Sequence, residues 1–141
     1  MYAPSQFIET RPALLRRLIE EYPLGTLITH GAEGLSADPI PFELGEPTGE
    51  FPHGVLRAHV ARANPLWQRA GSEALVVFQG ASAYVSPSLY EEKPLSGKVV
   101  PTYNYAVVQG RGTLRAIEDP AWLLDVLERL TARHEGGRAA P

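Results

Sequence analysis

Residues 59–67 read His-Val-Ala-Arg-Ala-Asn-Pro-Leu-Trp, and two further segments of the same kind follow before Tyr105. They are Phe78-Gln-Gly80, which runs on to Tyr84-Val-Ser-Pro87, and Lys98-Val-Val-Pro-Thr-Tyr-Asn-Tyr105. Each segment places polar or cationic side chains at the end of an apolar, β-branched run, where a strand would present them at the mouth of a pocket. The pattern predicts a small-molecule site built on a sheet.

The composition is that of one ordinary globular domain. With 141 residues, 44% of them apolar and 21% charged, the chain is long enough for a single core. Its net charge of −3 counts against a broad surface for nucleic acid, because neutralising phosphates needs clustered basic side chains. The lack of cysteine excludes disulfides, thiolate nucleophiles and cysteine-based metal sites. No leader or membrane-spanning run is apparent, so we expect a cytoplasmic protein with no membrane partner.

Two helices are predicted, one at each end of the domain. The first begins at Pro12 after a cap at Thr10 and stops at Pro23. The second begins at Asp119-Pro120 and ends at Gly136-Gly137. Its apolar stripe consists of Leu123, Leu124, Val126, Leu127 and Leu130. We expect a single domain over residues 1–135 and a frayed tail over residues 136–141.

Short strands separated by turns fill the region between the helices. Residues 24–29 and 35–42 predict a hairpin whose second strand lies at an edge or at its own frayed end, because Pro39 and Pro41 lack ladder donors. A short strand is expected at 55–59 and one buried on both sides at 75–78. After a turn at Gly80, a strand returns at 83–86. A long strand is expected at 103–115, in which Gly110 and Gly112 imply a bulge or a close backbone approach. Residues 43–54 and 87–97 are predicted surface loops. This order indicates a mainly β fold with flanking helices, built as a small antiparallel barrel.

Several familiar catalytic and metal-binding motifs are missing. Gly110-Arg-Gly112 lacks the third glycine and the helix of a dinucleotide fingerprint, and no GxxxxGK phosphate loop is present. Ser86-Pro87 lacks the GxSxG elbow of a serine hydrolase. The 4 histidines show no HxH or HExxH spacing. We therefore assign no catalytic residue and no metal site.

The first quoted segment is suited to binding an anion. Arg62 precedes Asn64, and Asn64 can cap a helical turn that begins at Pro65 and carries Trp67. A guanidinium, an amide and the free N–H groups of such a turn form a cradle for a phosphate monoester, and His59 could add a donor. The alternative interpretation is structural: Arg62 pairs with a surface carboxylate, Asn64 only caps the turn, and His59 is a satisfied core histidine.

The last quoted segment is suited to a flat ring. Lys98, Thr102, Tyr103 and Asn104 lie at the entrance of a predicted strand, where aromatic and amide groups can stack on a ring and hydrogen-bond its polar edge. The structural alternative is that Tyr103 and Tyr105 are ordinary strand aromatics.

Taken together, these segments resemble the PaiB-type, FMN-binding negative transcriptional regulators. The motifs that carry the resemblance occur in the family's order from residue 1 to about residue 135: Met1-Tyr-Ala-Pro-Ser-Gln-Phe7, Ile40-Pro-Phe42, residues 59–65, Phe78-Gln-Gly80, Tyr84-Val-Ser-Pro87 and Val100-Pro-Thr-Tyr-Asn-Tyr105. The resemblance implies an FMN-binding split β-barrel of the pyridoxamine-phosphate-oxidase-like kind, a homodimer, and FMN held in the groove between the subunits.

The resemblance also implies residue roles. Arg62 and Asn64 would hold the phosphate end of FMN, with His59 and Gln79 nearby. The ribityl or ring region would be lined from the other segment by Lys98, Thr102 and Asn104, beside Tyr103. The sequence departs from the family at four positions, where Leu89 and Tyr103 replace a usual tryptophan and Asp38 and Gln109 replace a frequent histidine.

The first hypothesis of function is a flavin-binding regulatory dimer without turnover of its own. The alternatives are a flavin-dependent oxidoreductase of the split-barrel superfamily, in which FMN supplies the redox chemistry, and a degenerate member with no bound flavin. Direct DNA binding is implied by the family label. However, Pro23 ends the first helix and the last helix has no helical partner within a short turn, so no helix-turn-helix is predicted. We expect any DNA affinity to be weak and sensitive to salt.

Overall fold

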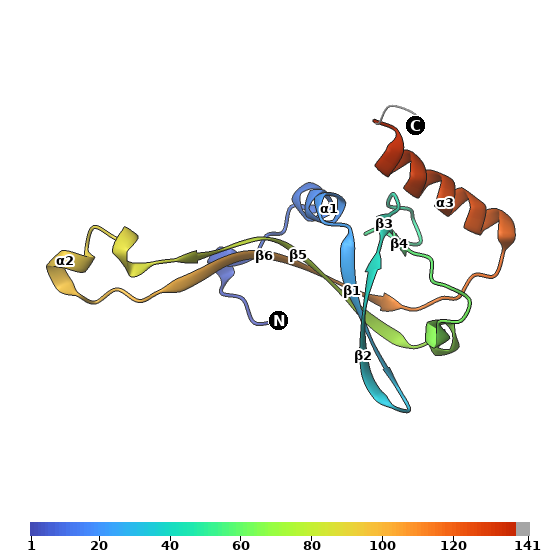
Figure 1. Ribbon diagram of the computed structural model, residues 1–141, viewed down its shortest axis with the longest axis horizontal. Coiled ribbons are helices and arrows are strands. Elements are labelled where there is room, and N and C mark those ends of the chain that lie inside the picture. Colours follow the sequence, from blue (N-terminus) through green and yellow to red (C-terminus); the bar gives the residue numbers. More distant parts are fainter. Residues whose placement is uncertain (138–141) are drawn as a thin grey trace.

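The computed structural model describes residues 1–137, and strands dominate them (Figure 1). The helical elements are η1 (Ser5–Phe7), α1 (Pro12–Glu21), η2 (Pro65–Arg69), η3 (Pro87–Leu89), α2 (Lys93–Ser96) and α3 (Pro120–Glu135). The strands are β1 (Leu24–Gly31), β2 (Gly34–Pro41), β3 (Glu43–Leu44), β4 (Leu56–Arg57), β5 (Glu73–Val85) and β6 (Thr102–Thr113). The predicted fold class, mainly β with flanking helices, is thereby confirmed.

A four-stranded antiparallel sheet forms the centre of the molecule. Its strand order is β2-β1-β5-β6, and β3 and β4 form a separate short pair, although β3 lies where a loop was predicted. The strands β1 and β2 make the predicted hairpin, and Pro39 and Pro41 occupy its edge strand as expected. The sheet, the small pair and the helices are consistent with the split-barrel fold that the resemblance implies.

One face of the sheet carries the core. Successive residues of a strand point to opposite faces, and Leu27 is the register partner of Val76, so these two buried side chains share a face. Phe78 lies on the same face, is 0% exposed, and meets Phe42 edge to face with ring centroids 5.7 Å apart. Burying a side chain of this size stabilises the fold by roughly 1.5–3 kcal/mol. The remaining buried members of the cluster are Ile19, Ile40 and Leu66.

The opposite face of the sheet remains open to solvent. Val77 and Gln79 of β5 point to this face together with their register partners Gln109 and Val107 of β6, and Ile28 of β1 lies on it as well. These side chains are half-buried or exposed, whereas Val76 and Phe78 behind them are buried. The prediction that residues 75–78 are buried on both sides is therefore wrong.

Strands β5 and β6 continue beyond the sheet as a long two-stranded ribbon that carries α2 at its far end (Figure 1). Because β5 passes through Gly80 without a turn, the predicted turn and the separate strand returning at 83–86 are wrong. Gly80 instead allows a close approach, since a Cβ there would lie 3.3 Å from Cδ1 of Leu18 in α1. The register of the ribbon shifts between Gln79 and Ser82, which places its bulge in β5.

The two glycines of β6 mark no bulge. Gly110 and Gly112 pair in unbroken register with Val76 and Ala74. For Gly110 the other predicted reason applies, because a Cβ there would lie 3.2 Å from Cδ1 of Leu56 in β4. This glycine lets the small β3–β4 pair approach the sheet closely.

The helix starts were predicted with mixed success. The cap predicted at Thr10 is wrong, because Arg11 is the N-cap of α1 and no side chain caps it. The carboxylate of Glu9 instead accepts hydrogen bonds from the backbone N–H groups of Thr10 and Arg11, at 2.9 and 2.8 Å. The cap predicted for α3 is confirmed, since Asp119 accepts a 2.8 Å hydrogen bond from the N–H of Ala121.

Only part of the predicted apolar stripe of α3 faces the protein. Val126 is fully buried, whereas Leu123 and Leu124 are exposed. The helix lies beside β3 and β4 (Figure 1). The frayed tail predicted for residues 136–141 falls mostly on residues 138–141, which lie outside the described residues.

Candidate functional site

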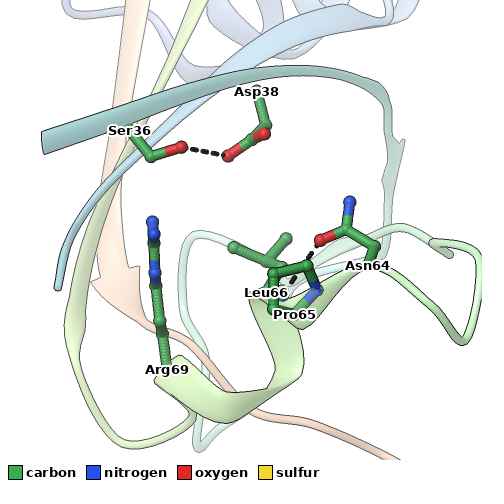
Figure 2. Close-up of a pocket in the computed structure, with 6 residues that line it drawn as sticks. All are labelled: Ser36, Asp38, Asn64, Pro65, Leu66 and Arg69. Atoms are coloured by element: carbon green, nitrogen blue, oxygen red, sulfur yellow. Dashed lines mark hydrogen bonds between the residues drawn. The ribbon is translucent and has the colours of Figure 1, made fainter. Parts of the chain in front are cut away.

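A small polar cavity lies between β2 and η2 (Figure 2). Its volume is about 290 Å³. We call it the β2–η2 pocket, and it is lined by Ser36, Asp38, Asn64, Pro65, Leu66 and Arg69. It therefore contains one residue of the predicted phosphate cradle, Asn64, together with charged residues that the sequence did not single out as ligands.

Asn64 holds the turn of η2 and faces the pocket. Its Oδ1 accepts a 2.9 Å hydrogen bond from the N–H of Leu66, so the predicted cap is confirmed. With Oδ1 engaged in this way, the amide nitrogen points away from the turn, toward the side of the cavity that Asp38 lines (Figure 2). The side chain therefore offers a hydrogen-bond donor to the pocket.

Arg69 is the cation of the β2–η2 pocket. It is the last residue of η2, it is half-buried, and its guanidinium donates a hydrogen bond to the hydroxyl of Thr29, which is only 2% exposed. Within residues 1–137 the guanidinium forms no ion pair. Sequence reasoning missed this residue. The signal that could have found it is a second cation at the end of the turn that Asn64 caps.

The opposite wall of the pocket is formed by β2. Asp38 and Ser36 alternate with outward-facing residues of the strand, and the Ser36 hydroxyl donates a 2.9 Å hydrogen bond to Oδ2 of Asp38. Asp38 and Arg69 face the cavity from different elements and form no ion pair with each other (Figure 2). The pocket thus presents one negative and one positive group that are both available to a ligand.

His59 and Arg62 of the predicted cradle lie outside the β2–η2 pocket. Both side chains are exposed, so the structural alternative in which His59 is a buried core histidine is wrong. Arg62 forms no ion pair with any carboxylate in the described part of the chain, so the alternative role of a surface pair is not observed either. One subunit therefore brings Asn64, but not Arg62 or His59, to the pocket.

A second hollow lies along the open face of the ribbon and has a volume of about 530 Å³. We call it the ribbon hollow, and it is lined by Met1, Val77, Gln79, Gly80, Ser82, Tyr103, Tyr105, Ala106, Val107 and Gln109. Two predicted residues, Gln79 and Tyr103, are among them. The ring of Tyr103 lies against that of Tyr84, with centroids 6.4 Å apart, and both rings are more than half exposed. Exposed aromatic faces of this kind can stack on a flat ligand.

Successive side chains of β6 point to opposite faces, and this separates the predicted cluster at residues 98–104. Tyr103 and Tyr105 point to the open face, whereas Thr102 and Asn104 point to the other face of the ribbon, opposite Val85 and Ala83. Lys98 precedes β6, is exposed, and lines neither cavity. A cluster that is continuous in sequence is therefore split between two surfaces.

The two cavities lie on opposite faces of the sheet. Asp38 is the register partner of Leu27, which places it on the core face with Val76. Gln79 and Tyr103 point to the open face. Consequently, this chain does not bring Asn64 together with Gln79 and Tyr103 in one cavity.

The described residues show two further absences. No helix within residues 1–137 combines the length and apolar character needed to cross a bilayer. In the same part of the chain, no three histidine, aspartate or glutamate side chains gather in a way that could hold a metal ion.

Comparison with known proteins gives the class of this chain. The sequence model of a family described as "Putative FMN-binding domain" matches residues 1–141, and the chain belongs to this family. The resemblance to PaiB-type proteins is also confirmed, since the chain is 29% identical to the Protease synthase and sporulation protein PAI 2 of Bacillus subtilis, over 100% of this chain and 65% of that protein.

Two fungal proteins are also similar. An uncharacterized protein of Emericella nidulans is 37% identical over 82% of this chain and 56% of its own length. An uncharacterized protein of Saccharomyces cerevisiae is 34% identical over 98% of this chain and 92% of its own length. The chain thus spans less than two thirds of the Emericella and Bacillus relatives and nearly all of the yeast relative.

Proposed function

We propose that this protein is an FMN-binding homodimer of the PaiB type that acts as a negative transcriptional regulator without catalytic turnover of its own. Membership of an FMN-binding family supports the choice of cofactor. The resemblance to the PaiB-type regulators, which the similarity to the Bacillus protein supports, favours a regulatory class over the flavin-dependent oxidoreductase. We place the function in the cytoplasm. DNA is a weak partner at most, because the net charge of −3 gives little attraction to phosphates.

The observation that carries this proposal is the open face of the sheet. Val77, Val107 and Ile28 lie on this face as half-buried apolar side chains, beside the polar Gln79 and Gln109. Soluble monomers rarely leave a large apolar surface uncovered, and a surface that pairs with its own copy gives a closed dimer.

FMN would occupy the groove between the two copies. In this arrangement Arg62 and Asn64 hold the phosphate end, and His59 and Gln79 lie nearby. The second segment supplies the ribityl and ring contacts through Lys98, Thr102, Tyr103 and Asn104. Exposed donors at residues 59–64 and exposed tyrosine rings on the ribbon fit a phosphorylated, hydroxylated tail and a flat ring, respectively.

Titration with FMN, followed by quenching of the flavin fluorescence, tests the proposal. We expect saturable binding by the wild-type protein and binding at least about tenfold weaker by Arg62→Ala, because a charged hydrogen bond to phosphate is worth about 1.5–3 kcal/mol. Light scattering after size exclusion should give twice the mass of the 15.4 kDa chain. Indistinguishable weak binding by both proteins would overturn the cofactor assignment, and a monomeric mass would overturn the dimer.

A further inference from the structure

We propose that the β2–η2 pocket binds a polyol phosphate, with the phosphate on Arg69 and a neighbouring hydroxyl on Asp38. Two sources share this chemistry, the ribityl phosphate of FMN and a free sugar phosphate. The first source rests on the proposed function, whereas the second does not. The inference adds Arg69, a residue that the sequence patterns did not indicate, to the cations that would hold the phosphate of FMN, beside the Arg62 proposed above.

The Arg69 guanidinium has no balancing negative charge in the described part of the chain. Removing a charge from water is unfavourable unless an opposite charge or hydrogen bonds replace the lost solvation. Arg69 is half-buried, is held by the buried hydroxyl of Thr29, and has no carboxylate partner within residues 1–137. A guanidinium has five N–H donors, so most of them remain free for an oxoanion that enters the pocket.

Asn64 supplies a second donor on the same wall. Its Oδ1 is engaged by the N–H of Leu66, which fixes the amide so that its nitrogen faces the cavity (Figure 2). Arg69 and Asn64 stand at the two ends of the same short turn, η2. Both residues line the pocket and present donors to a phosphate that enters it.

Asp38 determines what else the ligand must carry. Its carboxylate would repel a bare phosphate dianion, and one of its oxygens already accepts from Ser36. The other oxygen can accept a hydrogen bond from a ligand donor. A phosphate ester with adjacent hydroxyl groups satisfies both walls, because the phosphate goes to the cation and a hydroxyl goes to the carboxylate.

The size of the cavity agrees with such a ligand. Its volume of about 290 Å³ lies just below the range of roughly 300–1,000 Å³ that is typical for small-molecule sites. The pocket therefore suits a sugar phosphate or the tail of FMN, with the flavin ring outside it.

The experiment compares the binding of FMN, riboflavin, ribose 5-phosphate and inorganic phosphate by calorimetry. The variants are Arg69→Met, which removes the charge at similar length, and Asp38→Asn, which removes the opposing carboxylate. The matched control is Arg17→Met, which makes the same charge change at an exposed residue of α1 that pairs with Glu21. Circular dichroism checks that each variant is folded.

We expect the wild type to bind FMN more tightly than riboflavin and to bind ribose 5-phosphate. Arg69→Met should weaken both phosphorylated ligands by about tenfold or more and leave riboflavin unchanged, whereas Arg17→Met should match the wild type. Asp38→Asn should bind inorganic phosphate more tightly than the wild type and discriminate less between it and ribose 5-phosphate. If Arg69→Met does not fold, Arg69→Lys, which keeps the charge but loses the planar fork, and Asp38→Asn decide the question.

The outcomes separate this inference from the proposed function. If Arg69→Met binds FMN and keeps the wild-type preference for FMN over riboflavin, the inference is overturned and the proposed function stands. Where Arg69→Met does not fold, the same result in Arg69→Lys and Asp38→Asn has the same meaning. Binding of ribose 5-phosphate that depends on Arg69, without binding of FMN, would do the reverse. A wild type that binds neither ligand would overturn both.

Discussion

Arg129 in α3 donates a 2.6 Å hydrogen bond from Nε to Oε1 of Glu43 in β3. A second bond of 3.1 Å joins its Nη2 to Oε2 of the same carboxylate, and Asp125 one turn earlier in α3 also accepts from this guanidinium. The side-chain hydrogen bond with Glu43 is the main cause, and that with Asp125 the second, of a raised pKa of Arg129. This bidentate contact joins the last helix to the small β3–β4 pair.

Replacing this guanidinium should loosen α3. We expect Arg129→Met to lower the free energy of unfolding by about 1–2 kcal/mol. The loss is no larger because the Arg129 side chain is 37% exposed and solvent screens the contact. Urea denaturation measures the loss. Arg17→Met, which breaks an exposed pair within α1, should lower the free energy of unfolding much less. Equal losses in the two variants would show that the contact does not hold the helix.

Gly25 should not tolerate a side chain. A Cβ at this buried position of β1 would lie 2.7 Å from both Cε1 of Phe78 and Cγ1 of Val76, and neither of these buried side chains has room to move. We expect Gly25→Ala to lower the free energy of unfolding by about 1–3 kcal/mol, as overpacked cores do. The matched strand control is Gly112→Ala, since a Cβ there meets nothing within 4 Å, and it should be nearly neutral. Thermal denaturation of the two variants makes the comparison, and similar midpoints would contradict it.

The open face of the sheet should hold the dimer together. A charge at Val77 would be buried without a partner in the proposed interface, so Val77→Lys should produce monomers in size exclusion with light scattering. The same charge at Leu124, on the exposed side of α3, should leave the dimer intact. Dissociation by Leu124→Lys with an intact Val77→Lys dimer would place the interface on the helix instead.

The pKa of the Glu9 side chain should lie well below the ordinary value of a glutamate. Its side-chain hydrogen bond with Arg11, followed by a backbone hydrogen bond from the same residue, lowers its pKa from 4.5 to about 2. Because the ionised form is the one favoured by folding, this contact stabilises the start of α1 above about pH 4.5 and is lost as the pH falls toward 2. Carboxyl carbon shifts measured against pH should show the low midpoint. Arg11→Gln should return it toward 4.5, and a wild-type midpoint near 4.5 would contradict the assignment.

Bound flavin should not be reduced faster than free flavin. His59, the histidine that the sequence places beside the predicted site, is exposed and lines neither cavity, so it is not held where it could deliver a proton to a flavin ring. We expect anaerobic mixing of FMN-loaded protein with NADH or NADPH to bleach the flavin at the rate of free FMN. A clearly faster rate would favour the oxidoreductase alternative.

Local signals in the sequence predicted the elements that depend on neighbouring residues. The hairpin of β1 and β2, the edge position of Pro39, and the caps at Asn64 and Asp119 were predicted correctly, because turn and cap chemistry is satisfied within a few residues. Gly80 misled the prediction. Its lack of a side chain serves contact with Leu18 in another element, and no local pattern distinguishes that purpose from a turn.

The sequence by itself determined the class of the protein, since motifs kept in order along the chain define the FMN-binding family, and it determined the helix caps and the edge strand. Only the tertiary structure decided which polar residues share a cavity. Arg69 and Asp38 line one cavity because the fold brings η2 and β2 to the two sides of it, while the alternation of β6 separates Tyr103 from Asn104. Such contacts depend on strand register and on packing between distant segments, and neither is encoded in the spacing of residues along one stretch.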